Sequence, residues 1–277
     1  MTDYSRTIFF ISDSTAITAE TMGQSLLSQF EGIEFEEVTL PFVNSYKKSL
    51  HAYQQINLES EIKGMKPIVF STLIDPDIRQ LIKSSNCLFF DLIEEFIGKL
   101  ESELHRESSH TIGRYHGRTD EGVYDQRIHA VNYALSTDDG TATKNYDQAD
   151  VVLLGVSRTG KTPTCVYMGL QFGINAANYP LTEDDFKQNA IELPHVLNLF
   201  RDKLYGLTIN PKRLQMIRSE RRPGSLYSSL QQCQMELSQA EMLYATENIP
   251  YLNVTSMSVE EIASTILLEC NLHRHVL

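Results

Sequence analysis

Residues 150–162 read DVVLLGVSRTGKT, and this stretch decides how the chain can fold. Its last eight residues, Gly155 to Thr162, match the phosphate-binding P-loop pattern G-x-x-x-x-G-K-[ST] in full. The apolar run before them predicts a buried strand, and the pattern after them predicts a helix through Gln171. The stretch therefore predicts an α/β fold with a phosphate-binding loop at a strand-to-helix turn.

Every position of this P-loop motif has an expected task. Glycines let several backbone N–H groups approach a phosphate, and the helix N-terminus adds the positive end of its dipole. Lys161 is expected to act catalytically on the terminal phosphates, and the Thr162 hydroxyl to bind a magnesium ion. The predicted nucleotide-binding residues are Gly155, Val156, Ser157, Arg158, Thr159, Gly160, Lys161 and Thr162.

The motif alone does not name a reaction, because GTPases, motor ATPases and small-molecule kinases all use it. The sequence has no N-K-x-D guanine-reading motif, and no apolar strand ends in Asp at the usual place after the loop. The sequence does not identify the carboxylate that would support the metal. The candidates are Asp138, Asp139, Asp184 and Asp185.

The first part of the chain predicts strands at residues 7–11, 35–40, 67–72 and 87–90, alternating with helices. We expect an N-terminal lobe, residues 1–107, with a doubly wound, mostly parallel sheet. Its first helix is predicted to turn one face inward, made of Ala19, Met22, Leu26 and Phe30. Another helix has clear start signals, with Asp75 as N-cap and Pro76 in the first turn.

The alternation resumes with predicted strands at 150–154, 176–179, 204–209 and 251–254, in a P-loop kinase-like lobe spanning residues 148–277. Further helix starts are predicted at Asn210–Pro211 and at the Ser258/Glu261 capping box. Residues 108–147 are polar and are expected to connect the lobes. They are either a solvated linker or a loop that contributes to a shared active site.

Residues 12–15, SDST, follow the first predicted strand and precede a helix. Ser12, Ser14 and Thr15 are candidates for binding an anion, and Asp13 for a base or metal ligand. The alternative is ordinary helix capping by Ser14 or Thr15.

Arginines gather in residues 210–222, NPKRLQMIRSERR. Arg218 and Arg221 are the predicted phosphate or acceptor contacts, with Arg213 and Arg222 beside them. The alternative is a solvated helix face, although Arg218 and Arg222 would then form a like-charged pair four residues apart.

Composition excludes several classes of protein. The chain is 42% hydrophobic and 22% charged, and its net charge of −12 disfavours a nucleic-acid or membrane-surface binder. Neither a signal peptide nor a long apolar span is present, so a cytoplasmic protein is expected. The four cysteines lack CxxC spacing and are expected to be free thiols. The histidines show no zinc spacing, and only His116, in a polar stretch, is kept as a candidate.

Four separated segments are more specific than the P-loop motif. They are ISDSTAITAE (11–20), RIHAVNYALSTDDG (127–140), DVVLLGVSRTGKTPTCVYMGLQFGINAANYPL (150–181) and GLTINPKRLQMIRSERR (206–222). Together they resemble the phosphoenolpyruvate synthase regulatory proteins, which are related to the pyruvate, phosphate dikinase regulatory proteins. The resemblance covers essentially the whole chain.

This resemblance implies a bifunctional serine/threonine-protein kinase and pyrophosphorylase. One activity would move the β-phosphoryl of ADP to a threonine of phosphoenolpyruvate synthase and inactivate the synthase. The other would use inorganic phosphate to remove that phosphoryl as pyrophosphate. Asp13 or Asp139 would orient the threonine hydroxyl, and Arg158 would help Lys161 at the β-phosphate. A homodimer is implied by the resemblance alone. The rivals are an ATP-dependent small-molecule kinase and a non-catalytic nucleotide-sensing protein.

Overall fold

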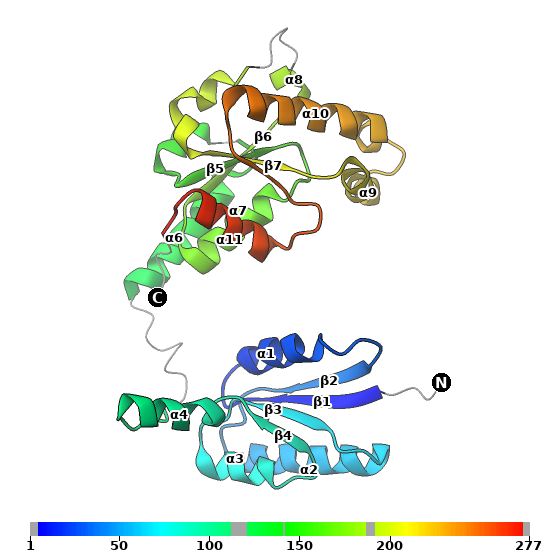
Figure 1. The fold of residues 1–277 in the computed structure, drawn as a ribbon, viewed down its shortest axis with the longest axis vertical. Helices are drawn as coiled ribbons and strands as arrows, with labels where there is room; N and C mark the ends of the chain where they lie inside the picture. The colour runs from blue at the N-terminus through cyan, green and yellow to red at the C-terminus, as the bar shows by residue number, and fades with distance from the viewer. Residues whose placement is uncertain (1–4, 112–120, 141, 187–191, 274–277) are drawn as a thin grey trace. The chain divides into compact units, whose positions relative to one another are not determined.

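The computed structural model describes residues 5–111, 121–140, 142–186 and 192–273. The chain divides into two compact units, residues 1–118 and 119–277. Each unit contains one four-stranded parallel sheet with helices packed on it (Figure 1). The predicted α/β fold with two parallel-sheet lobes is therefore confirmed.

The sheet of unit 1 runs in the order β2-β1-β3-β4 with every pair parallel. Its strands are β1 (Ser5–Ile11), β2 (Glu34–Leu40), β3 (Ile68–Ser71) and β4 (Leu88–Asp91). Its helices are α1 (Ile17–Leu27), α2 (Tyr46–Lys63), α3 (Pro76–Lys83) and α4 (Glu94–Leu104). Helix α1 lies on one face of the sheet, and α2 and α3 lie on the other (Figure 1). This is a doubly wound arrangement, and its order reverses between β1 and β3.

Helix α1 turns only part of the predicted face to the sheet, since Ala19 is buried and Met22 packs against the core. Ala19, Gly23 and Leu27 are buried, whereas Leu26 and Phe30 are exposed. The reason lies at Gly23, where an added Cβ would come within 2.5 Å of the Phe10 ring. A glycine at this position lets the helix approach the sheet closely, and Gly23 and Leu27 face inward in place of Leu26 and Phe30.

The predicted helix starts are confirmed where a side chain caps the helix. Asp75 Oδ1 accepts hydrogen bonds from the Asp77 and Ile78 amides, both at 3.0 Å, and Pro76 begins α3. Asn210 caps the Lys212 amide at 2.9 Å. Ser258 and Glu261 form a reciprocal capping box. Local sequence signals therefore determine these boundaries.

The sheet of unit 2 runs in the order β6-β5-β7-β8, again fully parallel. Its strands are β5 (Val151–Gly155), β6 (Ala176–Pro180), β7 (Leu204–Thr208) and β8 (Tyr251–Asn253). Its helices are α6 (Glu121–Ser136), α7 (Lys161–Phe172), α8 (Glu183–Phe186), α9 (Pro211–Arg221), α10 (Leu230–Glu247) and α11 (Val259–Glu269). Short 3-10 turns are η1 (Asp138–Gly140), η2 (Thr143–Gln148), η3 (His195–Lys203) and η4 (Leu226–Ser228).

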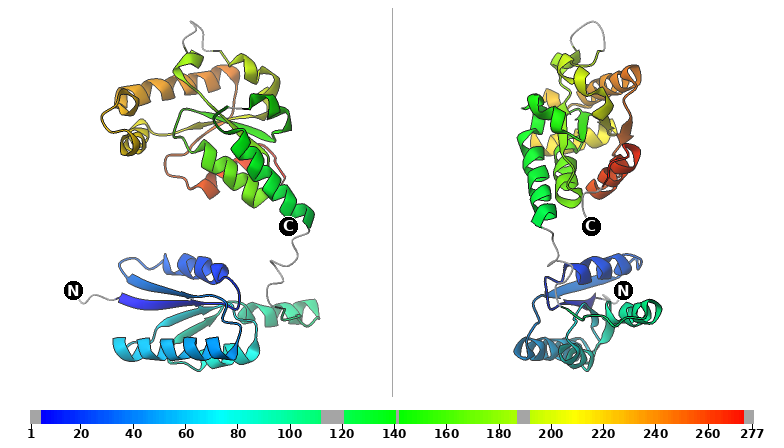
Figure 2. Two further views of the ribbon diagram at one scale, coloured as in Figure 1. Left: turned by 180° about the vertical axis from the view of Figure 1, so that it is seen from behind. Right: turned by 90° about the vertical axis from the view of Figure 1, so that its left-hand side faces the viewer.

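The two sheets share one topology. In each, the first strand of the chain is second in the sheet, and the strand order reverses beside it while all strands stay parallel. Helices α6, α7 and α11 lie on one side of the unit 2 sheet and α10 on the other, as Figure 1 and the left view of Figure 2 show. The buried residues of unit 2 form one continuous core that includes all of β5 and β7.

Much of the region predicted to connect the lobes belongs to unit 2. Helix α6 packs along α7, and η1 packs against β6. Tyr146 in η2 is fully buried and donates a hydrogen bond to the Asn178 carbonyl at 2.8 Å. The predicted boundaries stay a prediction, but the described part of 121–148 is folded against the sheet that carries the P-loop motif.

All four cysteines are free, as expected from their spacing. No helix in the described part of the chain is long and apolar enough to cross a membrane.

Candidate nucleotide site

The P-loop motif lies between β5 and α7, at the point where the unit 2 sheet reverses its strand order. This is the usual place for a ligand in an open parallel sheet. Gly160 immediately precedes α7 at φ 88°, a left-handed conformation that glycine adopts without strain. Arg158 is also left-handed, at φ 77°, which is costly for a residue with a side chain. The loop is thus held in a conformation that its neighbours must stabilise.

Lys161 begins α7 and folds its side chain back under the loop. Its Nζ donates to the carbonyls of Gly155 at 2.8 Å and Val156 at 3.0 Å, and the side chain is buried. Burial lowers the pKa of Lys161 to about 8, and the nearby carboxylates of Asp139 and Asp138 partly oppose that shift. Lys161 is therefore mostly protonated at pH 7 and loses its proton at a lower pH than an exposed lysine does.

A carboxylate meets the Thr162 hydroxyl. Thr162 Oγ1 donates to Asp138 Oδ1 at 2.7 Å, and the amide of Asn178 donates to the same oxygen at 2.7 Å. The Asn178 side-chain oxygen in turn accepts from the Asp139 backbone N–H at 3.2 Å. Asp139 itself is exposed and left-handed, at φ 51°. Turn η1 and strand β6 therefore bring Asp138 to the loop and place Asp139 beside it.

The oxygens of Thr162 and Asp138 suit a magnesium ion. Magnesium usually takes one or two protein oxygen ligands and completes its shell with phosphates and water. Among the described residues, no group of three or more His, Cys, Asp or Glu side chains could hold a metal by itself. The donor set thus fits an ion that arrives with a nucleotide, which it would help to orient while neutralising phosphate charge.

The other predicted metal carboxylates have different surroundings. Asp185 accepts hydrogen bonds from the Thr182 amide and hydroxyl, both at 2.8 Å, and from the Tyr179 hydroxyl at 3.0 Å. These contacts fix the start of α8. Asp184 is exposed on the same short helix. His116 lies outside the described residues.

Arg218 lies behind the loop and has no exposed surface. Its guanidinium donates to the Ser157 carbonyl, to the Tyr227 carbonyl and to Glu236. The alternative of a solvated helix face is therefore wrong for Arg218, which supports the P-loop motif from inside the fold. The phosphate or acceptor contact predicted for Arg218 stays a prediction. Arg221 lies at the exposed end of α9, and its predicted acceptor contact stays a prediction.

Residues 12–16 of unit 1 occupy the topological position that residues 156–160 occupy in unit 2. Ala16 precedes α1 at φ 67°, as Gly160 precedes α7, and neither Ser14 nor Thr15 caps the helix. Asp13 is buried, and its Oδ2 accepts from the Ile74 amide at 2.8 Å. Burial raises the pKa of Asp13. Because no side chain caps α1, the capping alternative for Ser14 and Thr15 is wrong.

The catalytic role predicted for Asp13, and the anion contacts predicted for Ser12, Ser14 and Thr15, stay predictions. Ser12 is buried and its Oγ accepts from the Ser14 amide at 3.1 Å, while Thr15 is exposed. These residues belong to unit 1, whereas the P-loop motif belongs to unit 2.

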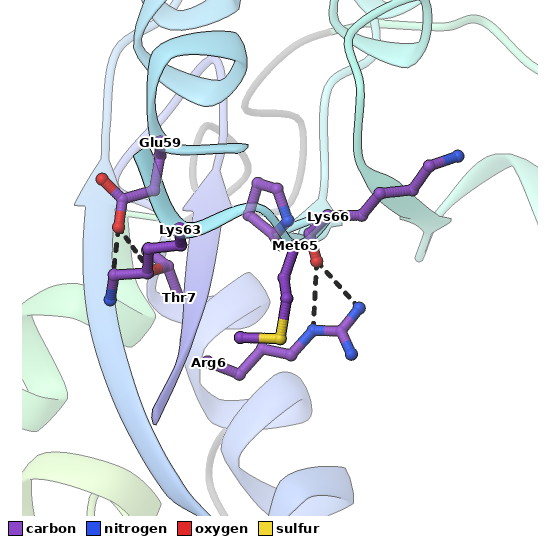
Figure 3. Close-up of a pocket in the computed structure, with 7 residues that line it drawn as sticks. Arg6, Thr7, Glu59, Lys63, Met65 and Lys66 are labelled. Atoms are coloured by element: carbon purple, nitrogen blue, oxygen red, sulfur yellow. Dashed lines mark hydrogen bonds and ion pairs between the residues drawn. The ribbon is translucent and has the colours of Figure 1, made fainter. Parts of the chain in front are cut away.

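At the edge of the unit 1 sheet opposite to residues 12–16, a small groove is lined by side chains that contact one another. Figure 3 shows Glu59 in contact with Thr7 and Lys63, and Arg6 in contact with the backbone carbonyl of Lys66. Thr7 donates to Glu59 at 2.6 Å, Lys63 pairs with Glu59 at 3.3 Å, and Arg6 donates twice to the Lys66 carbonyl. The groove lies at the amino end of β1, away from the edge where parallel sheets bind ligands.

Sequence reasoning missed three residues around the loop: Asn178, Tyr227 and Glu236. Asn178 carried a usable signal, because it is a fully buried amide within the otherwise apolar start of β6. Tyr227 and Glu236 reach the loop only through tertiary packing, and no local pattern marks them.

The fold and this site define an α/β protein with a P-loop motif supported by a threonine–aspartate pair. Residues 8–267 match the model of the kinase/pyrophosphorylase family. The chain belongs to this family, so phosphotransferase chemistry is its general class.

Three relatives carry the name "Putative phosphoenolpyruvate synthase regulatory protein". The protein from Alkalilimnicola ehrlichii is 51% identical over 276 residues, covering 100% of both chains. The protein from Legionella pneumophila strain Corby is 50% identical over 271 residues, covering 98% of this chain and 99% of the relative. The protein from Pseudomonas fluorescens is 51% identical over 269 residues, covering 97% and 98%.

Proposed function

We propose that this protein regulates phosphoenolpyruvate synthase by reversible phosphorylation of a threonine, with ADP as phosphoryl donor and inorganic phosphate as the reagent for removal. Family membership supports a kinase and pyrophosphorylase, and the names of the relatives support the synthase as partner. The observation that carries the proposal is the P-loop motif with Lys161 beneath it and Thr162 bonded to Asp138.

The two reactions balance as displacements at phosphorus. In the first, the threonine oxygen bonds to the β-phosphorus of ADP, the bond to the bridging oxygen breaks, and AMP and the hydroxyl proton leave. In the second, an oxygen of inorganic phosphate bonds to the phosphothreonine phosphorus. The threonine oxygen then departs, takes up a proton, and pyrophosphate is released. Both reactions need stabilised phosphate charge and an aligned oxygen, so one pocket can serve both.

The proposed roles at the nucleotide follow from the geometry. Backbone N–H groups of residues 156–160 and the start of α7 surround the phosphates. Lys161 exchanges its bonds to the Gly155 and Val156 carbonyls for the β-phosphate, and exposed Arg158 adds charge there. Thr162 and Asp138 would hold a magnesium ion, which would neutralise phosphate charge.

The carboxylate that orients the threonine hydroxyl is proposed to be Asp13 or Asp139. Asp139 lies within the electrostatic reach of Lys161, and Asp13 has a pKa raised by burial, as a general base requires. Replacing each with asparagine separates them, because only loss of the true base lowers the transfer rate while ADP binding persists. Arg221 is proposed to contact the acceptor phosphate.

Mass spectrometry of purified phosphoenolpyruvate synthase tests the proposal. Incubation with this protein, magnesium and ADP should add one phosphothreonine, and later addition of inorganic phosphate should remove it. The Lys161→Ala variant should add none. An unmodified synthase would overturn the proposal, and the remaining alternative would be a non-catalytic nucleotide-sensing protein. Turnover of a metabolite by ATP, without a protein acceptor, would instead identify a small-molecule kinase.

A further inference from the structure

Arg218 is a fully buried charge, and each of its three nitrogens donates a hydrogen bond to another protein group. Its Nε and Nη2 donate to the Ser157 carbonyl at 3.3 and 3.1 Å, and Nη1 donates to the Tyr227 carbonyl at 3.1 Å. Nη2 also pairs with Glu236 at 2.6 Å. Burying an arginine is expensive unless its donors are matched in this way. The contacts that match these donors hold the Ser157 carbonyl, the Tyr227 carbonyl and Glu236 in place.

The held group is a peptide of the P-loop motif. In a trans peptide, the carbonyl of one residue and the N–H of the next point to opposite sides of the plane. Arg218 fixes the Ser157 carbonyl on the side of α9 and α10, so the Arg158 N–H points to the other side. Arg158 itself is left-handed, at φ 77°. Such a turn gathers backbone N–H groups into a concave anion site.

A second contact fixes the same peptide. The Tyr227 hydroxyl is 2.9 Å from Ser157 Oγ, and the Arg218 guanidinium lies 4.2 Å from the centre of the Tyr227 ring. Glu236 is held in turn by Gln232, whose Nε2 donates to Glu236 Oε1 at 2.9 Å. Helices α9 and α10 and turn η4 are thereby connected to one peptide of the loop.

We propose that Arg218 is a positioning residue that presents the Arg158 N–H to the β-phosphate of a nucleoside diphosphate. It acts through the Ser157–Arg158 peptide and does not touch phosphate itself. This inference rests on the proposed function for the identity of the nucleotide.

The Arg218→Lys variant separates geometry from charge. Lysine keeps the positive charge and can still pair with Glu236, but it has no planar fork to bond Ser157 as well. Loss of one hydrogen bond to a charged phosphate predicts ADP binding weaker by about 10- to 100-fold. A residue that merely supplied charge to phosphate would be largely rescued by lysine.

A double replacement tests the same role in a variant that is expected to fold. Arg218→Met with Glu236→Met removes both charges of this ion pair at once, and such replacements often leave stability unchanged or raise it. Its matched control is Arg201→Met with Glu247→Met, which removes another ion pair of unit 2. ADP affinity is measured by calorimetry, and hydrogen exchange of residues 156–161 is measured without nucleotide.

The expected result is faster exchange of the loop amides and weaker ADP binding in both Arg218 variants, with the control pair like wild type. Folded Arg218 variants with wild-type exchange and wild-type ADP affinity would overturn the inference. The exchange measurement needs no nucleotide. The positioning role is therefore decided even if the synthase proves not to be phosphorylated, a result that would count against the proposed function alone.

Discussion

ADP binding is expected to weaken as the pH rises through 8, because Lys161 must be charged to pair with the β-phosphate. Burial holds the pKa of this lysine to about 8 in the free protein. From that value, about 90% of Lys161 is protonated at pH 7 and about 10% at pH 9. A bound phosphate stabilises the ammonium and raises its pKa, so binding above pH 8 must take up a proton.

The expected magnitude is a loss of about tenfold in ADP affinity between pH 7 and pH 9, measured by calorimetry at constant ionic strength and magnesium. Lys161→Arg provides the matched control, because an arginine stays charged over the whole range. Its affinity should vary much less with pH. A wild-type affinity that is equal at pH 7 and pH 9 would refute the pairing of a titrating Lys161 with phosphate.

Three further predictions follow from the same structure. In the unfolded chain Lys161 keeps its proton up to its ordinary pKa of 10.5, whereas in the folded protein it loses the proton near pH 8. The free energy of unfolding of the wild type minus that of Lys161→Met, measured by denaturation, should therefore rise with pH between about 8 and 10.5. A decrease in this difference over the same range would contradict the effect of burial on Lys161. Asp138→Asn should raise the magnesium concentration for half-maximal activity by about tenfold or more, and an unchanged magnesium titration would remove Asp138 from the metal site. Gly23→Ala should lower the free energy of unfolding by about 1–3 kcal/mol because its Cβ meets the Phe10 ring. Gly98→Ala, which meets nothing, should raise it by about 0.4–1 kcal/mol in urea titrations; equal effects would contradict the close packing of α1.

The sequence alone predicts the features of this fold that depend on neighbours in the chain. Alternating apolar runs predict both parallel sheets, and the Asp75, Asn210 and Ser258 caps predict three helix starts. The inward face of α1 was predicted only in part, because Ala19 and Met22 face the core whereas Leu26 and Phe30 are exposed. Its orientation depends on ring packing at Gly23, which a hydrophobic pattern does not include.

The residues of the nucleotide site likewise fall into those that a local sequence pattern identifies and those that only tertiary packing brings together. The P-loop motif could be located from the sequence because its spacing is local. The choice among four candidate aspartates could not be made, because Asp138 reaches Thr162 through the packing of η1 on β6. Arg218 was predicted at the site, but its buried guanidinium is directed at the Ser157 carbonyl, a tertiary contact with no local signal.

The central claim is that the β-phosphoryl of ADP moves to the synthase, and isotope tracing tests it most directly. ADP labelled at the β-phosphorus is incubated with this protein, magnesium and purified phosphoenolpyruvate synthase, and parallel samples contain ATP labelled at the γ-phosphorus. Under conditions that prevent nucleotide interconversion, label from ADP should appear on a synthase threonine with release of unlabelled AMP. Label that reaches the synthase only from ATP, or never reaches it, would contradict the claim.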